Sequence, residues 1–160
     1  MRDEFEVNRA VDTYADMVRR ICFCHLKNDM DTEDIFQTVF LKYMLYDGTF
    51  ESAEHEKAWF IRVSINACKD FFKSLFRRNT IPLDEVTELA AEYPEDHSRV
   101  LQAVLELPEK YRDVIYLHYY EAYSAAEIAN ILKSREGTVY SLLSRGRAML
   151  KRSLGGEIDE

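Results

Sequence analysis

The stretch from Ser124 to Leu150, SAAEIANILKSREGTVYSLLSRGRAML, has the pattern of two helices separated by a short break. Ser124 followed three residues later by Glu127 is typical of a capping box, in which each side chain bonds the other residue's backbone N–H. The first helix then has one apolar face, formed by Ala125, Ile128, Ala129 and Leu132. This part of the sequence therefore predicts a short helix that begins at a strong N-terminal signal.

The second helix follows the KSR break and has two chemically different faces. Its apolar side has a 3.6-residue spacing and consists of Val139, Leu142, Leu143, Gly146 and Leu150. The opposite side carries Gly137, Tyr140, Ser141, Ser144 and Ala148, with Arg145 and Arg152 at its edges. Small residues allow close approach, and hydroxyl and guanidinium groups can bond base edges and phosphates, so we predict the recognition helix of a helix-turn-helix. A helical hairpin packed into a core is the alternative, although it would not need a small, polar and basic outer face.

The chain as a whole is acidic, with 29 Asp and Glu against 21 Lys and Arg and a formal net charge of -8. Two basic islands interrupt it: residues 57–79 carry 6 cations and 1 acid, and residues 124–154 carry 6 cations and 2 acids. Basic islands on helices are typical of contact with a polyanion, and solvated helix faces are the alternative interpretation.

Composition favours an all-α fold in the cytosol. Only 5 Gly and 3 Pro occur among 160 residues, and long stretches are rich in helix-forming residues. The N-terminus lacks the pattern of a signal peptide, and no segment reaches about 18 uncharged apolar residues, so we expect no membrane segment. The cysteines Cys22, Cys24 and Cys68 lack a paired C-x-x-C spacing, and we expect buried reduced thiols rather than a zinc site.

Residues 57–78, KAWFIRVSINACKDFFKSLFRR, form a second informative helix. Its expected buried stripe is Ala58, Ile61, Ile65, Cys68, Phe72 and Leu75. A separate face carries Arg62, Asn66, Lys69, Lys73 and Arg77, with Trp59 beside it at the start of the helix. Cations interleaved with aromatic rings suit opened nucleic acid, because phosphates need charge and unstacked bases need a flat apolar partner. An ordinary amphipathic helix with a core tryptophan is the alternative.

Upstream, residues 29–44, DMDTEDIFQTVFLKYM, begin with acids, which are favourable at a helix N-terminus. One face of this helix then presents Asp34, Gln37, Thr38 and Leu41. Acids, an amide and a leucine together favour a protein-binding surface over a DNA-binding one, with a solvated face as the alternative.

Residues 80–99 divide the chain, because they contain two of the three prolines and six acids with little helical periodicity. We therefore predict a helical domain over residues 1–79, an acidic linker over 80–99, a helix-turn-helix domain over 100–154 and a tail over 155–160.

Three motifs in this order resemble those of extracytoplasmic-function sigma factors, the small subunits that direct bacterial RNA polymerase. The segment DTEDIFQTVF, residues 31–40, looks like the family's D-x-E-D signature, and WFIRVSINACKDFF, residues 59–72, is similar to its W-x-x-R-x-x-x-N segment. LPEKYRDVIYLHYYEAYSAAEIANIL, residues 107–132, with the GTVYSLLSRGRAML that follows at 137–150, is similar to its helix-turn-helix. The resemblance spans about nine-tenths of the chain.

The resemblance implies a protein with no catalysis, metal or cofactor of its own, whose partners are core RNA polymerase, promoter DNA and an anti-sigma factor. It implies core-polymerase binding by Asp31, Glu33, Asp34, Gln37, Phe40 and Leu41. It implies recognition and opening of the minus-ten element by Trp59, Arg62, Asn66, Lys69 and Lys73, with the loop from Asp47 to Glu56 holding a flipped base. It implies reading of the minus-thirty-five element by the helix from Ser134 to Arg147, through Arg135, Glu136, Gly137, Thr138, Tyr140, Ser141, Ser144, Arg145 and Arg147. The acidic linker would follow the RNA exit path.

The sequence departs from the family pattern at the turn and on the recognition helix. Lys133 stands where relatives usually have Gly, and a lysine is less favourable than glycine at positive φ. Ser134 and Arg135 replace an aliphatic residue and a Ser or Pro, and Tyr140 and Leu142 replace two expected cations. The recognition helix therefore lacks two cations that the family pattern has. A stand-alone helix-turn-helix regulator with a helical sensor, and a helical module that sequesters a partner, are the alternative functions.

Overall fold

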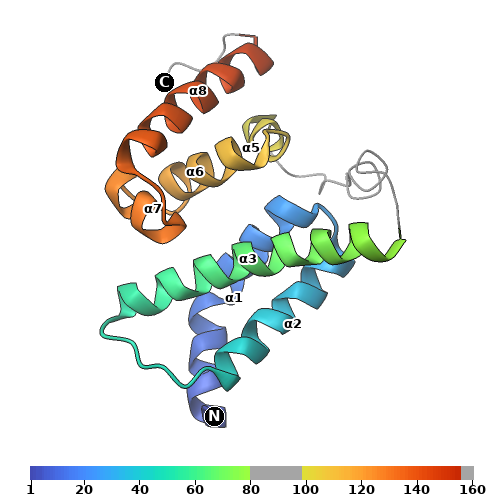
Figure 1. Ribbon diagram of the computed structural model, residues 1–160, viewed down its shortest axis with the longest axis vertical. Coiled ribbons are helices and arrows are strands. Elements are labelled where there is room, and N and C mark those ends of the chain that lie inside the picture. The colour runs from blue at the N-terminus through green and yellow to red at the C-terminus, as the bar shows by residue number, and fades with distance from the viewer. Residues whose placement is uncertain (80–98, 156–160) are drawn as a thin grey trace. The chain divides into compact units, whose positions relative to one another are not determined.

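The structure is a computed structural model that describes residues 1–79 and 99–155. These residues form α-helices and no strand, which confirms the predicted all-α fold. The chain divides into two compact units, residues 1–92 and 93–160 (Figure 1). The predicted linker over 80–99 and the tail over 155–160 lie almost wholly outside the described residues. Among the described helices, none is long and apolar enough to span a membrane.

The N-terminal unit is a bundle of three helices, α1 (Glu4–Leu26), α2 (Asp29–Leu45) and α3 (Ala53–Asn79). Side-chain caps begin the first two: Asp3 accepts a hydrogen bond from the N–H of Glu6, and Asn28 accepts one from the N–H of Asp31, both at 2.8 Å. Each helix packs against the other two, so side chains from all three meet in one core.

The apolar periodicity of these helices predicts their buried faces well. On α3, Ile61, Ile65 and Cys68 are buried, while Ala58, Phe72 and Leu75 at the ends of the predicted stripe are half-buried. The three cysteines are buried free thiols, as expected. Because one stripe of α3 is committed to the core, its basic face is turned to solvent.

The C-terminal unit contains α5 (Arg99–Leu105), α6 (Glu109–Tyr119), α7 (Ala125–Leu132) and α8 (Glu136–Ser153). Helix α8 packs against α5, α6 and α7. The approach of α8 to α6 is close at Gly146, where an added Cβ would lie 3.0 Å from Cγ1 of Ile115. This glycine therefore permits the close approach of the two helices on the buried side of α8.

The turn between α7 and α8 forms as a helix-turn-helix connection. The predicted capping box is present, with Ser124 and Glu127 each accepting a hydrogen bond from the other's backbone N–H. Helix α7 ends at Lys133, which adopts the left-handed conformation with φ 57° and ψ 49°. The N–H groups of Lys133 and Ser134 both bond to the carbonyl of Ala129, so the lysine is accommodated in a turn that glycine usually occupies. Helix α8 starts at Glu136, two residues after Ser134.

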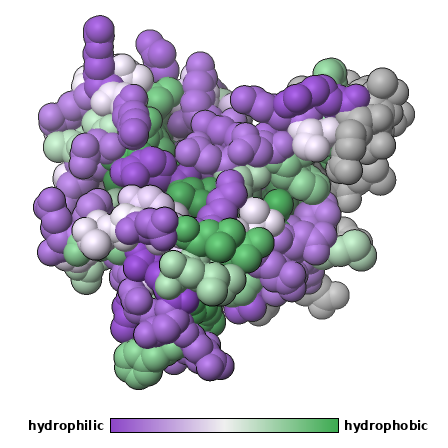
Figure 2. Space-filling model, turned by 60° about the horizontal axis from the view of Figure 1, so that its bottom comes forward, coloured by the Kyte–Doolittle hydropathy of each residue, from purple (hydrophilic) through white to green (hydrophobic). Residues whose placement is uncertain are grey.

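Hydrophilic side chains cover most of the surface visible in Figure 2, with a smaller apolar area among them. The exposed large apolar side chains among the described residues include Phe5, Leu41, Leu45 and Tyr140. Scattered exposure of this kind is normal, so the functional surfaces are identified from charge and position as well.

Changing Lys133→Gly should raise stability by about 0.5–1 kcal/mol. An L-residue in the left-handed region costs about 1–2 kcal/mol, and glycine's greater freedom in the unfolded chain offsets part of the gain. Urea unfolding followed by circular dichroism measures the change. Lys151→Gly is the matched control, because this exposed lysine lies in regular helix and its replacement should cost about 1 kcal/mol. Equal destabilisation by both changes would contradict the left-handed turn.

Candidate functional site

The outer face of α8 gathers small, hydroxyl and cationic side chains. Tyr140, a large side chain of this face, has 59% of its surface exposed. The nine residues assigned to this surface are all exposed: Arg135, Glu136, Gly137, Thr138, Tyr140, Ser141, Ser144, Arg145 and Arg147. The apolar side of the same helix is buried, since Val139, Leu143, Gly146 and Leu150 lie in the core of the unit. The two-faced pattern predicted for this helix is therefore confirmed.

Arg147 differs from the other cations of α8 because the structure fixes its position. Its Nη1 donates a hydrogen bond of 3.1 Å to the hydroxyl of Tyr119 on α6. It also lies at a mostly apolar cavity of about 450 Å³ lined by residues of α5, α6 and α8, including Val104 and Leu150. Arg147 is thus oriented by α6, whereas no side-chain partner is found for Arg145 among the described residues.

The basic face of α3 is continuous over several turns. Asn66, Lys69, Lys73 and Arg77 are exposed, and Arg62 is half-buried. Residues three and four apart are neighbours on a helix surface, so these side chains form a single row. A row of cations on a rigid helix can follow a phosphate backbone, as the sequence predicted.

Trp59 has a different environment from the rest of this group. Only 8% of its surface is exposed, and its ring packs near those of Tyr43, Tyr46 and Phe50 at centroid distances of 5.8, 5.2 and 5.9 Å. Tyr46 and Phe50 belong to the α2–α3 loop, residues 46–52. Trp59 therefore supports this loop from within, and its ring is not an open stacking surface.

A buried carboxylate joins the three helices of the N-terminal unit beside the loop. Oε2 of Glu56 accepts hydrogen bonds from Nη2 of Arg9 at 2.9 Å and from the hydroxyl of Tyr43 at 2.7 Å. Its Oε1 accepts one from the hydroxyl of Tyr14 at 3.0 Å. Arg9 and Tyr14 lie on α1, Tyr43 on α2 and Glu56 on α3. Glu56 stands at the end of the loop range expected to engage DNA. Both oxygens of its carboxylate are hydrogen-bonded inside the protein.

The network changes the acid–base properties of its members. Burial would raise the pKa of Glu56, but the hydrogen bonds from Arg9, Tyr43 and Tyr14 outweigh burial and hold that pKa below the ordinary carboxyl value of 4.5. Burial, followed by the hydrogen bond to Glu56, raises the pKa of Tyr14 and of Tyr43 to about 12. The carboxylate is thus charged and both phenols are neutral near neutral pH.

Sequence reasoning missed Arg9, Tyr14 and Tyr43 as members of this network. They are far apart in the chain, and each fits an ordinary helix position. The available signal was an acid, Glu56, that falls one turn before the apolar Phe60 in a helix whose other acids are Glu54 and Asp70.

The predicted polymerase face on α2 is only partly open. Asp34, Gln37 and Leu41 are exposed, with 51% of the leucine accessible, and Asp31 is half-buried. Glu33 is exposed but paired with Arg19, whose Nε and Nη2 donate to it at 2.8 and 3.3 Å. Phe40 is buried, with its ring centroid 5.1 Å from that of Phe60 in the core. The open part of this face is therefore a leucine beside an acid and an amide.

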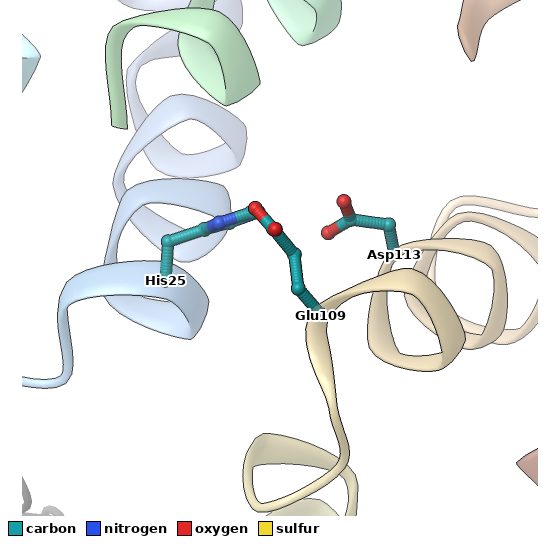
Figure 3. A group of neighbouring side chains, drawn as sticks. All are labelled: His25, Glu109 and Asp113. Carbon is teal, nitrogen blue, oxygen red and sulfur yellow. The ribbon is translucent and has the colours of Figure 1, made fainter. Parts of the chain in front are cut away.

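Figure 3 draws His25, which lies on α1, with Glu109 and Asp113, which lie one turn apart on α6. The histidine and the two carboxylates belong to different units, whose positions relative to one another are not determined. These side chains therefore carry no metal-site assignment.

Comparison with known proteins gives a consistent family. The family described as Sigma-70 region 2 matches residues 10–78, and the family described as Sigma-70, region 4 matches residues 97–150. The ECF RNA polymerase sigma factor SigW of Bacillus subtilis is 29% identical over 161 residues, covering 90% of this chain and 86% of the relative. The ECF RNA polymerase sigma factor SigM of Mycobacterium tuberculosis is 27% identical, with 96% and 79% covered.

Solved structures support the fold. The sigma factor RpoE from Bartonella quintana, solved with the anti-sigma factor NepR, has a TM-score of 0.71 and 21% identity, with 96% of this chain and 99% of that chain covered. CnrH, solved with the cytosolic domain of CnrY, has a TM-score of 0.68 and 20% identity, with 98% and 92% covered.

Changing Glu56→Gln should destabilise the protein by about 1–3 kcal/mol at pH 7, because a neutral amide replaces the charged acceptor of three hydrogen bonds. The partial exposure of Arg9 limits the loss of stability, since water screens its charge. The pKa of Glu56 is lower in the folded than in the unfolded chain. Its stabilisation is therefore present above the ordinary carboxyl pKa of 4.5 and is lost as the pH falls through the lower folded value.

Urea unfolding at pH 7 and near pH 3 would measure this difference. The gap between wild type and Glu56→Gln should narrow in acid. Glu54→Gln, which neutralises an exposed acid in the first turn of the same helix, is the control and should change stability little. A gap of equal size at both pH values would contradict the network.

Proposed function

The chain belongs to the extracytoplasmic-function sigma factors of bacterial RNA polymerase, and from this premise we propose which of its surfaces perform each step of initiation. As a sigma factor it binds core RNA polymerase and directs initiation at specific promoters. A stand-alone helix-turn-helix regulator is not favoured, since the N-terminal unit matches sigma region 2. We assign residues 1–79 to core binding and the minus-ten element, 80–99 to a linker and 100–154 to the minus-thirty-five element.

The exposed part of α2 is the proposed docking surface for core polymerase. Leu41 supplies an accessible apolar contact, and Asp34 and Gln37 lie on the same face with groups that can accept and donate hydrogen bonds. Glu33 acts here together with Arg19, because the two side chains are already paired. Phe40 supports the surface from the core.

The basic row of α3 is the proposed contact for the opened minus-ten element. Lys69 and Lys73 provide phosphate contacts, while Asn66 provides a polar group that can bond an unpaired base edge. A cavity of about 450 Å³, lined in part by Phe50 and Thr49 of the α2–α3 loop, lies beside the start of α3. Its volume is in the range of small-ligand sites, and we assign it to a flipped non-template base.

The outer face of α8 is the surface that we propose recognises the minus-thirty-five element. The composition of this face is the observation that carries the proposed function. Opposite its buried side, α8 exposes small and hydroxyl residues around Tyr140 and Ser141, with Arg145 able to reach a phosphate. This arrangement suits a helix in a major groove. Its few cations indicate that polymerase supplies much of the affinity of the complex for the promoter.

The remaining assignments follow from membership of the family. Catalysis belongs to the polymerase, and the protein acts in the cytosol where the polymerase transcribes. An anti-sigma factor is the proposed negative regulator, and the linker is proposed to follow the RNA exit path. Of the linker, the structure describes only Arg99.

Changing Arg62→Ala or Asn66→Ala should reduce open-complex formation by about 5- to 150-fold while leaving the affinity for core polymerase unchanged. These side chains meet DNA in this assignment, and loss of contacts to an extruded base costs about 1–3 kcal/mol. Permanganate footprinting measures strand opening, and gel filtration with core enzyme measures binding. Asp34→Ala with Gln37→Ala is the converse control, since it should weaken core binding instead. Normal strand opening by both α3 variants would contradict the assignment.

Changing Tyr140→Lys should strengthen non-specific DNA binding by the full chain and steepen its logarithmic salt dependence by about 0.9, the contribution of one new phosphate contact. It should also alter base preference in the minus-thirty-five element, because Tyr140 lies on the groove-facing side. Fluorescence anisotropy over a salt series measures both. Lys151→Ala, which removes a cation at the far end of α8, is the charge control. It should lower the slope of the salt dependence without changing base preference. An unchanged slope and preference in Tyr140→Lys would show that this side of α8 does not face DNA.

A further inference from the structure

Arg2 lies between the start of α1 and the α2–α3 loop, and its side chain is only 12% exposed. Its guanidinium carbon is 4.6 Å from the centroid of the Tyr43 ring and 5.1 Å from that of Phe50. Nη2 donates a hydrogen bond of 2.7 Å to the carbonyl of Gly48, and Nη1 donates one of 3.0 Å to Glu6 on α1. The backbone N–H of Arg2 also bonds to the carbonyl of Met44 at 2.9 Å. One residue thus bridges α1, the end of α2 and the loop.

The backbone of the loop depends on this bridge because few other hydrogen bonds reach it. Among the residues that the structure describes, the hydrogen bond from Arg2 to Gly48 is the one that holds the backbone between Asp47 and Phe50. The ring of Tyr46 lies directly against Gly48, where an added Cβ would be 2.4 Å from the ring. The ring therefore lies on one side of the glycine, while the guanidinium is bonded to the glycine carbonyl.

The position of Arg2 bears on the cavity assigned above to a flipped base. Arg2 and Phe50 both line that cavity, and Phe50 is also one of the two closest rings around the guanidinium. Movement of Arg2 would therefore displace a wall of the cavity. The guanidinium is fixed by its planar contacts even though its Nε is buried without an acceptor among the described residues.

We propose that Arg2 is a positioning residue for promoter recognition, which holds the α2–α3 loop in the conformation that discriminates the flipped base of the minus-ten element. The proposal rests on the assignment of this loop and of α3 to the minus-ten element. It makes Arg2 act through the loop, without a contact of its own to DNA. Arginine is required because its planar fork donates two hydrogen bonds in fixed directions while its faces stack on rings, which a lysine ammonium cannot reproduce.

The test compares variants on two promoters that differ at one base of the minus-ten element. That base is the position where substitution most slows strand opening by the wild-type holoenzyme on the promoter of its own operon. The variants are Arg2→Gln, Arg2→Lys and Gly48→Ala, and the last should displace the ring of Tyr46, and with it the packing of Phe50, without altering Arg2. Arg20→Gln removes an exposed cation from α1, the helix that follows Arg2, as a charge control, and Asn66→Ala tests the underlying assignment. Core affinity and thermal unfolding are measured for each full-length variant.

We expect Arg2→Gln, Arg2→Lys and Gly48→Ala each to lower the discrimination between the two promoters by about fivefold or more, the smallest effect usually seen for one mismatched base. Core affinity and the behaviour of Arg20→Gln should stay at wild-type values. A residue that only stabilises the fold would slow opening equally on both promoters, leaving their ratio unchanged.

Three results would overturn the inference. If the Arg2 variants keep wild-type discrimination while Asn66→Ala loses it, the assignment of the minus-ten face stands and Arg2 has no positioning role. If Arg2→Lys alone keeps discrimination, positive charge suffices and the bridging geometry does not matter. If Asn66→Ala also keeps discrimination, the minus-ten assignment itself fails, and the inference fails with it. Gly48→Ala provides the same readout should Arg2→Gln fail to fold.

Discussion

The N-terminal unit depends on one buried carboxylate. Glu56 stands at the start of α3 and accepts hydrogen bonds from Arg9 and Tyr14 on α1 and from Tyr43 on α2, so a single acid connects all three helices. A charge in this position is tolerated only because each oxygen is bonded and a guanidinium lies against it. The network fixes α3 relative to its neighbours, and with it the direction of the basic row. The α2–α3 loop is held at the same point by Arg2 and the surrounding rings.

In the C-terminal unit, packing between helices keeps the outer face of α8 exposed. Gly146 lets α8 approach Ile115 closely, and the buried side of α8 leaves its hydroxyl and cationic residues outward. In both units an acidic chain keeps its positive charge on the exposed face of a helix whose other face is committed to a core. Few cations are available on either face, so we expect the chain by itself to bind DNA with modest affinity.

Local patterns predicted most of the fold, because helix periodicity and caps are set by neighbouring residues. The capping box at Ser124, the two faces of α8 and the buried stripe of α3 are confirmed. The burial of Trp59 agrees with the alternative interpretation of a core tryptophan, which the sequence left open because the partners of its ring lie on α2 and in the α2–α3 loop. The hydrogen bonds of Glu56 could not be predicted, since they come from other helices. Arg2 was missed for the same reason: its partners are a loop carbonyl and rings more than 40 positions away in the chain. Tertiary contacts of this kind leave little local trace in a sequence.

Run-off transcription with purified core polymerase tests the central claim most directly. The template carries the promoter of the protein's own operon, and the chain is supplied with core enzyme, without it, or not at all. The account predicts one discrete transcript that requires both proteins, together with weak binding of the chain alone to the same DNA. Tight, sequence-specific binding by the chain alone, without a transcript that depends on core enzyme, would contradict it.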